Sequence, residues 1–493
     1  MQRPERSPWP LPLEQAAIIE THISTLFFVG DRVFKLHKPV RFGFLDFRER
    51  EERRVDCERE VILNRRLAPD VYLGVADVVL DCQPIDHMVV MRRLPEECRL
   101  SAIASRGEEL TGRLLAIAEA LVSFHRSAAR SPEISHAATA EALREDWEAN
   151  FIETDRFVGT VLDESDEAEI RRRAFRWVDG RDGLLASRIA TGRVCDGHGD
   201  LQADDIFCLD DGVRILDCIE FSDQLRYVDV CADVAFLAMD LERLRHPEAA
   251  ARFLLSYQEL ADDWFPESLL HHYLATRAYV RAKVSCLQAD QGAPDAVAQA
   301  RRFHRIARDH LRRSQVTLVL IGGLPGSGKS TLASGLGDAR GWSILRSDEI
   351  RKDARGSLEE RIAQDPAGHY GPDATDAVYG ELLHQAEGAL GRAESVILDA
   401  SWIDGRQRDA ARVMAARTSS ELVELCCEVP PEEADRRILR RLAQGSSVSE
   451  ATPDVREAMR RRMDPWEWAT VIDTSRGETA EAVAAALAAL ASV

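Results

Sequence analysis

The chain alternates short β-prone runs with longer amphipathic stretches, and the two kinds of stretch are arranged differently before and after residue 314. In the first part, residues 24–36 contain two β-rich runs around Gly30 and Asp31, which is typical of a β-hairpin. Residues 87–93 predict a further strand. Apolar positions recur at helical spacing in four other segments: 50–67, 108–129, 140–154 and 228–313, the last interrupted at 291–294.

After residue 314, short apolar runs alternate with helical stretches. Five of these runs are candidate strands: 316–322, 343–346, 395–399, 422–428 and 470–473. Runs that are apolar throughout are typical of parallel strands buried on both faces, and their alternation with helices predicts a layered α/β fold. We therefore predict two domains, an α+β domain over residues 1–313 and an α/β domain with a parallel sheet over residues 314–493.

The charge and composition of the chain narrow the classes of function. Acidic residues outnumber basic ones by 84 to 64, and both halves of the chain are acidic. A DNA-binding protein needs a basic face to displace counterions, so we expect no DNA partner. No apolar run is long enough to span a bilayer, residues 1–12 lack the apolar core of a signal peptide, and the ten cysteines show no metal-binding spacing. These features predict a cytoplasmic protein without a membrane partner.

A phosphate-binding motif follows the apolar run 316–322. The segment Gly323-Leu-Pro-Gly326-Ser327-Gly328-Lys329-Ser330-Thr331 fits the pattern G-x-x-x-x-G-K-[ST]. Glycines let main-chain N–H groups turn toward phosphates, and the helix that follows presents its positive end. Lys329 can supply charge to the β- and γ-phosphates, and the Ser330 hydroxyl can bind Mg²⁺. The motif predicts an ATP site.

Two charged residues follow the next apolar run of this half. Asp348 and Arg351 come directly after the run 343–346, at the end of a strand where ligands bind in open α/β sheets. Asp348 could accept a substrate hydroxyl proton, and Arg351 could hold an anionic group. The alternative is a helix cap at Ser347 or Asp348 with surface charges beside it.

An acid and a pair of arginines complete the C-terminal motifs. Asp399 ends the run 395–399, as a Walker B ligand of Mg²⁺ does. Arg437 and Arg441 lie one turn apart on one face of a predicted helix, where they could close on phosphates. The alternative is a solvated basic face.

In this order the motifs resemble the P-loop kinases that include gluconate kinases, zeta toxins and polynucleotide 5′-kinases, over about residues 316–475. The resemblance implies a three-layer, AAA-type P-loop NTPase fold and transfer of the ATP γ-phosphate to a hydroxyl. It also implies that Asp348 is the substrate-facing acid and that Arg437 and Arg441 are lid residues.

The first half carries a cluster of acids after residue 195. Asp200 and Asp205 lie five residues apart, and Asp217 follows an apolar run. Phosphoryl transfer needs a base for the attacking hydroxyl and oxygen ligands for Mg²⁺, and these three acids suit those roles. The alternative is an acidic turn with solvated carboxylates.

A lysine within a strand supports the presence of a site. Only five of the 64 basic residues are lysines, and Lys35 lies inside the β-rich run 33–36, where lysine is disfavoured. Glu60 lies on the helix predicted next, and a strand lysine paired with a helix glutamate holds the α- and β-phosphates in kinase-like folds. Lys38 and Glu58 compete for these two roles, and Lys35 could instead be a charged residue of an edge strand.

These residues resemble the aminoglycoside phosphotransferase family, a branch of the protein-kinase-like fold, over roughly residues 20–290. The segment His198-Gly199-Asp200-Leu201 is similar to the catalytic loop of that family. The resemblance implies a bilobal fold with the following roles: Asp200 as base, Asp217 as Mg²⁺ ligand, Lys35 as nucleotide lysine, Glu60 as its partner, and Asp233 as a mainly structural residue. The whole chain resembles bacterial fusions of an aminoglycoside phosphotransferase with an ATP-binding domain.

Two departures from that family concern the N-terminal site. Asp205 stands where the family usually has asparagine, so it can bind Mg²⁺ but adds negative charge, and no G-x-G-x-x-G loop precedes Lys35. We expect a bifunctional kinase that uses ATP and Mg²⁺ to phosphorylate small hydroxylated metabolites, such as a sugar, an amino sugar or an amino alcohol. Two alternatives remain: one half is a degenerate nucleotide-binding regulator of the other, or the enzyme is a stress-related or toxin-like kinase of a macromolecule or a nucleotide sugar.

Overall fold

The chain forms two compact units, and neither is a continuous stretch of sequence. The structure, a computed structural model, describes residues 17–20, 23–42, 45–352, 372–444, 452–475 and 479–491. One unit comprises Met1–Ala138 with Arg188–Phe265, and the other comprises Thr139–Ser187 with Pro266–Val493. The chain therefore passes between the units three times. The predicted boundary near residue 314 separates the motifs, not these units, and it stays a prediction.

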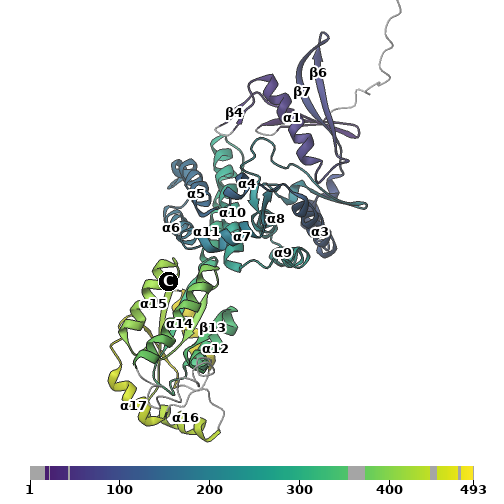
Figure 1. The fold of residues 1–493 in the computed structure, drawn as a ribbon. Helices are drawn as coiled ribbons and strands as arrows, with labels where there is room; N and C mark the ends of the chain where they lie inside the picture. The colour runs from purple at the N-terminus through teal and green to yellow at the C-terminus, as the bar shows by residue number, and fades with distance from the viewer. Residues whose placement is uncertain are drawn as a thin grey trace, which may run out of the picture. The chain divides into compact units, whose positions relative to one another are not determined.

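The first unit begins with a five-stranded antiparallel sheet of order β1-β2-β3-β7-β6, of which β6 and β7 are labelled in Figure 1. Its strands are β1 (Ala17–Glu20), β2 (Ser24–Val29), β3 (Arg32–His37), β6 (Tyr72–Leu80) and β7 (Gln83–Arg92). A separate short pair, β4 (Arg41–Phe42) with β5 (Leu45–Asp46), follows β3. Strands β2 and β3 form the hairpin predicted at residues 24–36. Helix α1 (Arg50–Asn64) packs on the sheet because its Cys57 and Val61 share an apolar cluster with Val89.

The rest of the first unit is mainly helical and contains two short antiparallel pairs. Strand β8 (Val194–Asp196) pairs with β11 (Tyr227–Asp229), and β9 (Ile206–Leu209) pairs with β10 (Gly212–Ile215). The helices are α2 (Leu100–Ser105), α3 (Thr111–Ser127), α4 (Pro132–His136), α8 (Val230–Arg243) and α9 (Pro247–Ala261). The loops that carry Asp200, Asp205 and Asp217 adjoin the ends of these short strands.

The second unit contains a parallel sheet of order β13-β14-β12-β15-β16. Its strands are β12 (Thr317–Gly322), β13 (Ser343–Arg346), β14 (Val396–Asp399), β15 (Glu421–Glu428) and β16 (Thr470–Asp473). All five fall on the predicted runs. Strand β12 is central and wholly buried, so the sheet confirms the predicted α/β fold.

Helices surround this sheet (Figure 1). The same unit also includes a helical bundle built from earlier parts of the chain. Those near the sheet are α12 (Lys329–Arg340), α14 (Pro372–Gly391), α15 (Gly405–Arg417), α16 (Pro431–Gln444), α17 (Pro453–Arg462) and α18 (Thr479–Ala491). Those of the bundle are α5 (Ala140–Thr154), α6 (Glu164–Val178), α10 (Glu267–Asp290) and α11 (Ala296–Arg313), while α7 (Asp182–Ala190) begins in this unit. None of the helices in the described part of the chain is long and apolar enough to cross a membrane.

The turn after α6 joins the bundle to the sheet region of the same unit. Arg181 is almost fully buried, and its Nη1 donates hydrogen bonds to the carbonyls of Leu390 at 2.9 Å and Thr418 at 3.0 Å. These carbonyls lie at the C-terminal ends of α14 and α15, where intrahelical donors run out. Gly180 allows the close approach, because a Cβ at that position would lie 2.2 Å from the Thr418 oxygen.

Candidate active sites

Lys35 points into the first unit and meets two carboxylates. Strand β3 alternates in burial, so that Val33, Lys35 and His37 share the inner face. The Lys35 ammonium lies 2.9 Å from Glu60 Oε1 and 3.1 Å from Asp217 Oδ1. Burial alone would lower the pKa of Lys35, but the carboxylates of Asp217 and Glu60 together raise it well above its usual value. The ammonium is therefore held in its charged form.

Lys38 and Glu58, the alternatives to Lys35 and Glu60, lie elsewhere. Lys38 contacts Glu20 at 3.0 Å on the surface, and Glu58 pairs with Arg54 along the exposed side of α1. Glu60 is fully buried; burial opposes its ionisation, yet Lys35 and His37 bring its pKa down to about 2. Of the two lysines and two glutamates considered from the sequence, Lys35 and Glu60 form the buried ion pair.

Asp233 holds the main chain of the segment that precedes Asp200. The buried carboxylate of Asp233 accepts hydrogen bonds from the main-chain amides of His198 and Gly199 and from His125 Nε2 at 3.0 Å. Gly199 adopts φ +89°, and a Cβ there would lie 2.8 Å from the carbonyl of Leu225. The loop before Asp200 is thus fixed at its main chain.

The three predicted acids of this half act on one another. Asp205 is partly buried, and burial, together with the charges of Asp217 and Asp200, raises its pKa well above the usual range. Asp217 has a left-handed backbone, with φ 62°, and a half-exposed side chain, while Asp200 accepts a hydrogen bond from Gln202 at 2.8 Å. Mutual repulsion among carboxylates is what a bound divalent cation relieves, so the donor set fits Mg²⁺.

The P-loop connects β12 to α12 with three glycines at positive φ. Gly323, Gly326 and Gly328 have φ values of +132°, +82° and +86°. A Cβ at Gly326 would lie 2.6 Å from the carbonyl of Ala434, and one at Gly323 would lie 2.5 Å from that of Cys427. The loop therefore packs against neighbouring main chain too tightly for larger residues.

Lys329, Ser330 and Asp399 meet next to this loop. Lys329 Nζ donates to the loop carbonyl of Leu324 at 3.2 Å, and the Ser330 hydroxyl hydrogen-bonds Asp399. Burial raises the pKa of Asp399, while Lys329, Ser330 and Arg346 oppose the rise. Thr331 follows on the first turn of α12. The lysine, hydroxyl and Walker B acid of the sequence motif are thus neighbours, and they fit a Mg²⁺–nucleotide complex.

The arginines of α16 divide between two faces. Arg437 donates to the main-chain carbonyl of Thr474 at 2.8 Å, and the Thr474 hydroxyl in turn donates to the carbonyl of Ser327 at 2.6 Å. Arg441 is half-buried on the same face, whereas the side chain of Arg436 is 75% exposed. Arg437 is thus linked through Thr474 to the P-loop, and Arg441 lies one turn further on the same side of α16.

The predicted substrate residues lie on the short helical segment that begins at Ser347. The charge of Asp348 acts on Asp399, and that of Arg351 acts on Tyr379. Both residues are thus within electrostatic reach of the carboxyl end of β14. The structure adds one neighbour there that sequence reasoning missed: Tyr379 hydrogen-bonds both Ser401, at 3.1 Å, and the amide of Trp402.

Sequence reasoning also missed three residues near Lys35. His37, Asp56 and Glu220 are all buried close to Glu60. The signal for His37 was its position two residues after Lys35, on the same face of the strand. Asp56 lies one turn before Glu60 on α1, and Glu220 lies three residues after Asp217.

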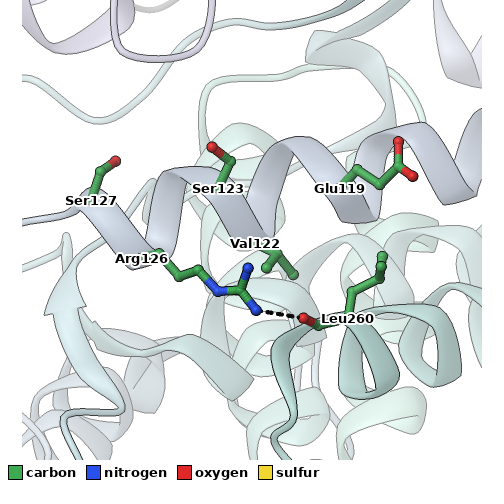
Figure 2. Close-up of a pocket in the computed structure, with 6 residues that line it drawn as sticks. All are labelled: Glu119, Val122, Ser123, Arg126, Ser127 and Leu260. Atoms are coloured by element: carbon green, nitrogen blue, oxygen red, sulfur yellow. Dashed lines mark hydrogen bonds between the residues drawn. The ribbon is translucent and has the colours of Figure 1, made fainter.

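A groove of about 410 Å³ lies away from these residues, on the first unit (Figure 2). It is lined by α3 and the end of α9, where Arg126 donates to the carbonyl of Leu260 at 2.7 Å. None of the predicted site residues lines it.

Comparisons with known proteins relate both halves of the chain to other proteins. A family model described as "AAA domain" matches residues 318–466. The chain is 40% identical over 462 residues to "Uncharacterized protein Rv2004c" of Mycobacterium tuberculosis (strain ATCC 25618 / H37Rv), with 92% of each chain covered. It is 33% identical over 150 residues to an adenylate kinase of Thermus thermophilus, and the match covers 30% of this chain and 75% of that protein.

Two solved structures are similar to one part each. A gluconokinase from Sinorhizobium meliloti 1021 has 17% identity and a TM-score of 0.29, covering 36% of this chain and 92% of its own. A choline/ethanolamine kinase family protein from Mesorhizobium loti has 13% identity and a TM-score of 0.36, covering 61% and 87%.

The P-loop and the parallel sheet, together with the family match and the similarity to an adenylate kinase, define an enzyme of the kinase class with a P-loop kinase part, as predicted. Within that class, the chain belongs to the family of the mycobacterial protein, which it matches over nearly its whole length.

Proposed function

We propose that the chain is a bifunctional ATP-dependent phosphotransferase that moves the ATP γ-phosphate to hydroxyl groups of small metabolites at two separate sites. The observation that carries the proposal is the buried contact of Lys35 with Glu60 and Asp217, in a chain that also holds a P-loop with Lys329 and Ser330 beside Asp399.

In the N-terminal site, Lys35 binds the α- and β-phosphates and Glu60 holds the ammonium in place. Asp200 accepts a hydrogen bond from the substrate hydroxyl and orients its oxygen toward the γ-phosphate. Asp205 and Asp217 are the residues that would hold Mg²⁺, and the ion would offset charge on the phosphates when bound. Asp233 keeps the loop before Asp200 in place and touches no substrate.

In the C-terminal site, the main-chain amides of the P-loop and Lys329 bind the β- and γ-phosphates. Ser330 and Asp399 would hold Mg²⁺. Arg437 and Arg441 approach the phosphates from α16, Asp348 receives the substrate hydroxyl, and Arg351 binds an anionic group of the acceptor.

The acceptor of the N-terminal site is a sugar, an amino sugar or an amino alcohol. Asp200, Asp205 and Asp217 make this site acidic, and an ammonium group on the acceptor would be attracted to it. The reaction takes place in the cytoplasm, which supplies ATP and keeps the ten free cysteines reduced.

A panel of sugars, amino sugars and amino alcohols with Mg-ATP tests the proposal, with the full chain and three lysine variants. Lys35→Ala should abolish phosphorylation of one acceptor and Lys329→Ala that of another. Each loss should be about 10²-fold or more, because each lysine stabilises charge on the transferred group. Lys283→Ala is the matched control, since Lys283 pairs with Glu153 on the surface of the helical bundle. The proposal is refuted if both activities survive in the Lys35→Ala variant and in the Lys329→Ala variant.

A second candidate function is that the N-terminal half binds nucleotide and regulates the other half. Asp205, with its raised pKa beside two further acids, favours it, because the added charge opposes the phosphates. Asp205→Asn distinguishes the two ideas. A catalytic site should keep or gain turnover of its acceptor, whereas a regulatory site should change only the nucleotide affinity and the rate of the C-terminal reaction.

A further inference from the structure

A second group of titratable side chains lies beside the Lys35–Glu60 pair. His37 follows Lys35 on the inner face of β3, Asp56 precedes Glu60 by one turn of α1, and Glu220 follows the loop of Asp217. All are buried, with exposed fractions of 1% for His37, 7% for Asp56, 0% for Glu60 and 3% for Glu220. The proposed phosphotransfer uses only Glu60 of these four.

The spacing of their polar atoms is that of ligands around a small cation. His37 Nε2 lies 3.3 Å from Glu60 Oε2 and 3.6 Å from Asp56 Oδ2. One ligand atom each of His37, Glu60 and Glu220 lies within 4.8 Å of the others. Metal–ligand bonds of about 2.0–2.2 Å at tetrahedral angles separate neighbouring ligand atoms by about 3.3–3.6 Å. The separations of His37 Nε2 from Glu60 Oε2 and Asp56 Oδ2 match these values, and the Glu220 carboxylate lies within 4.8 Å of the His37 and Glu60 ligand atoms.

Several of these atoms make no hydrogen bond within the described part of the chain. They are Nδ1 and Nε2 of His37, Oδ2 of Asp56 and Oε2 of Glu60. Glu60 uses its other oxygen, Oε1, for Lys35. His37 Nε2, Glu60 Oε2 and Asp56 Oδ2 face one another at ion-pair distance, and because buried polar atoms without a full set of hydrogen bonds are destabilising, a cation among them would be favourable.

The charges of the group point to a divalent partner. The Lys35 ammonium faces Glu60 and Glu220 and also contacts Asp217, so the carboxylates around it outnumber it. Burial raises the pKa of Glu220 well above its usual value and that of Asp56 to about 6. Burial thus disfavours the charged form of both carboxylates, and a cation beside them would favour it.

We propose that His37, Glu60 and Glu220 bind one Zn²⁺ ion, at a site separate from the Mg²⁺ ligands Asp205 and Asp217, with Asp56 beside the imidazole. One imidazole nitrogen with carboxylate oxygens at tetrahedral spacing is a zinc-type donor set. The ion links His37 of β3 to Glu60 of α1. It fixes the carboxylate of Glu60, so that Lys35 is held in position for nucleotide binding. Its role is structural and positioning.

Metal content of the full-length chain tests the site independently of kinase activity. The protein is stripped with a chelator, equilibrated with Zn²⁺ in the presence of millimolar Mg²⁺, dialysed and analysed by elemental mass spectrometry. We expect one zinc per chain, and a rise in the thermal unfolding midpoint on adding zinc. His37→Asn and Glu220→Gln should each lose the bound zinc and the rise. His384→Asn, which removes an exposed histidine of α14, should retain both.

Co²⁺ provides a second readout that does not depend on the stability of the variants. In the unmodified protein it should give the intense visible absorption of a tetrahedral site, and added Zn²⁺ should abolish that absorption. The proposal is overturned if the stripped protein takes up no zinc under these conditions, or if His37→Asn binds as much zinc as the unmodified chain. Loss of zinc binding with intact phosphotransfer would leave the proposed function standing, and zinc binding without phosphotransfer would refute only that function.

Discussion

The carboxylate of Asp233 accepts a hydrogen bond from the main-chain amide of His198 at 2.8 Å, two residues before Asp200. The same carboxylate bonds His125 Nε2, and His125 Nδ1 lies 2.7 Å from the hydroxyl of Tyr257. The loop of the proposed base is therefore positioned by a buried chain of polar groups that runs from α8 to α3 and α9.

Replacing Asp233 with alanine should destabilise the first unit by about 3–5 kcal/mol, because it leaves buried amides and an imidazole without their acceptor. Turnover at the N-terminal site should fall while the P-loop reaction of the protein that remains folded is unchanged. Urea unfolding and the two activity assays measure these effects. Asp31→Asn, in the exposed turn between β2 and β3, should change stability by less than about 0.5 kcal/mol.

Arg437 and Arg436 are adjacent on α16 but face different surroundings, which makes them a matched pair. Arg437→Ala should lower kcat/KM for ATP at the C-terminal site by about 10²-fold, because the guanidinium lies next to the P-loop. Arg436→Ala should leave the rate unchanged, since that side chain is directed to solvent. Steady-state kinetics of both variants test this prediction. Equal losses of kcat/KM in the two variants would contradict the assignment of Arg437 to the phosphate site.

Among the residues that the structure describes, Arg181 is buried without a carboxylate partner, and burial, with the nearby charge of Arg176, lowers its pKa to about 10. Its replacement by methionine should still destabilise the second unit by about 2–3 kcal/mol, because the helix-end carbonyls of Leu390 and Thr418 lose their donor. Arg172→Met, on the exposed side of α6, is the control. Denaturant unfolding should separate the two variants, and indistinguishable midpoints would mean that these hydrogen bonds add no stability.

Acid should weaken the helical bundle of the second unit through Glu167. Burial alone would raise the pKa of this carboxyl, but hydrogen bonds from His304, Arg171 and Tyr279 lower it below the usual value. The stabilisation is therefore present above the ordinary glutamate pKa of about 4.3, and it is lost as the pH falls below that value.

Glu167→Gln should lower stability at pH 7 and flatten the loss of stability between about pH 5 and pH 3. The readout is the unfolding midpoint as a function of pH. Glu164→Gln, on the exposed first turn of α6, should keep the pH dependence of the unmodified chain. A profile for Glu167→Gln that is as steep as that of the unmodified chain would contradict this role of the network.

The strands of the second unit could be predicted closely from the sequence, because each is a short apolar run bounded by polar residues. The run 470–473 coincides with β16. The pairing of Lys35 with Glu60 was also accessible, since a buried lysine in a strand needs an acid and α1 is the next helix along the chain.

Other parts of the site depend on contacts between distant segments and could not be predicted. Lys35 meets Asp217 across 182 residues, and the positions of His37 and Glu220 around Glu60 depend on how α1 packs on β3. Local periodicity contains no information on such approaches. For the same reason, nothing in the sequence indicated that the helices of residues 139–187 pack with the P-loop part of the chain.

That packing has a consequence for the order of events during synthesis. Arg181 leaves the ribosome 237 residues before Thr418, and at about 5–20 residues per second the delay is roughly 10 to 50 seconds. Throughout this interval, Arg181 lacks the carbonyl of Thr418, and the main chain at Gly180 lacks the segment that packs against it. The nascent chain must keep these residues from other proteins until the last third of the polypeptide has been translated.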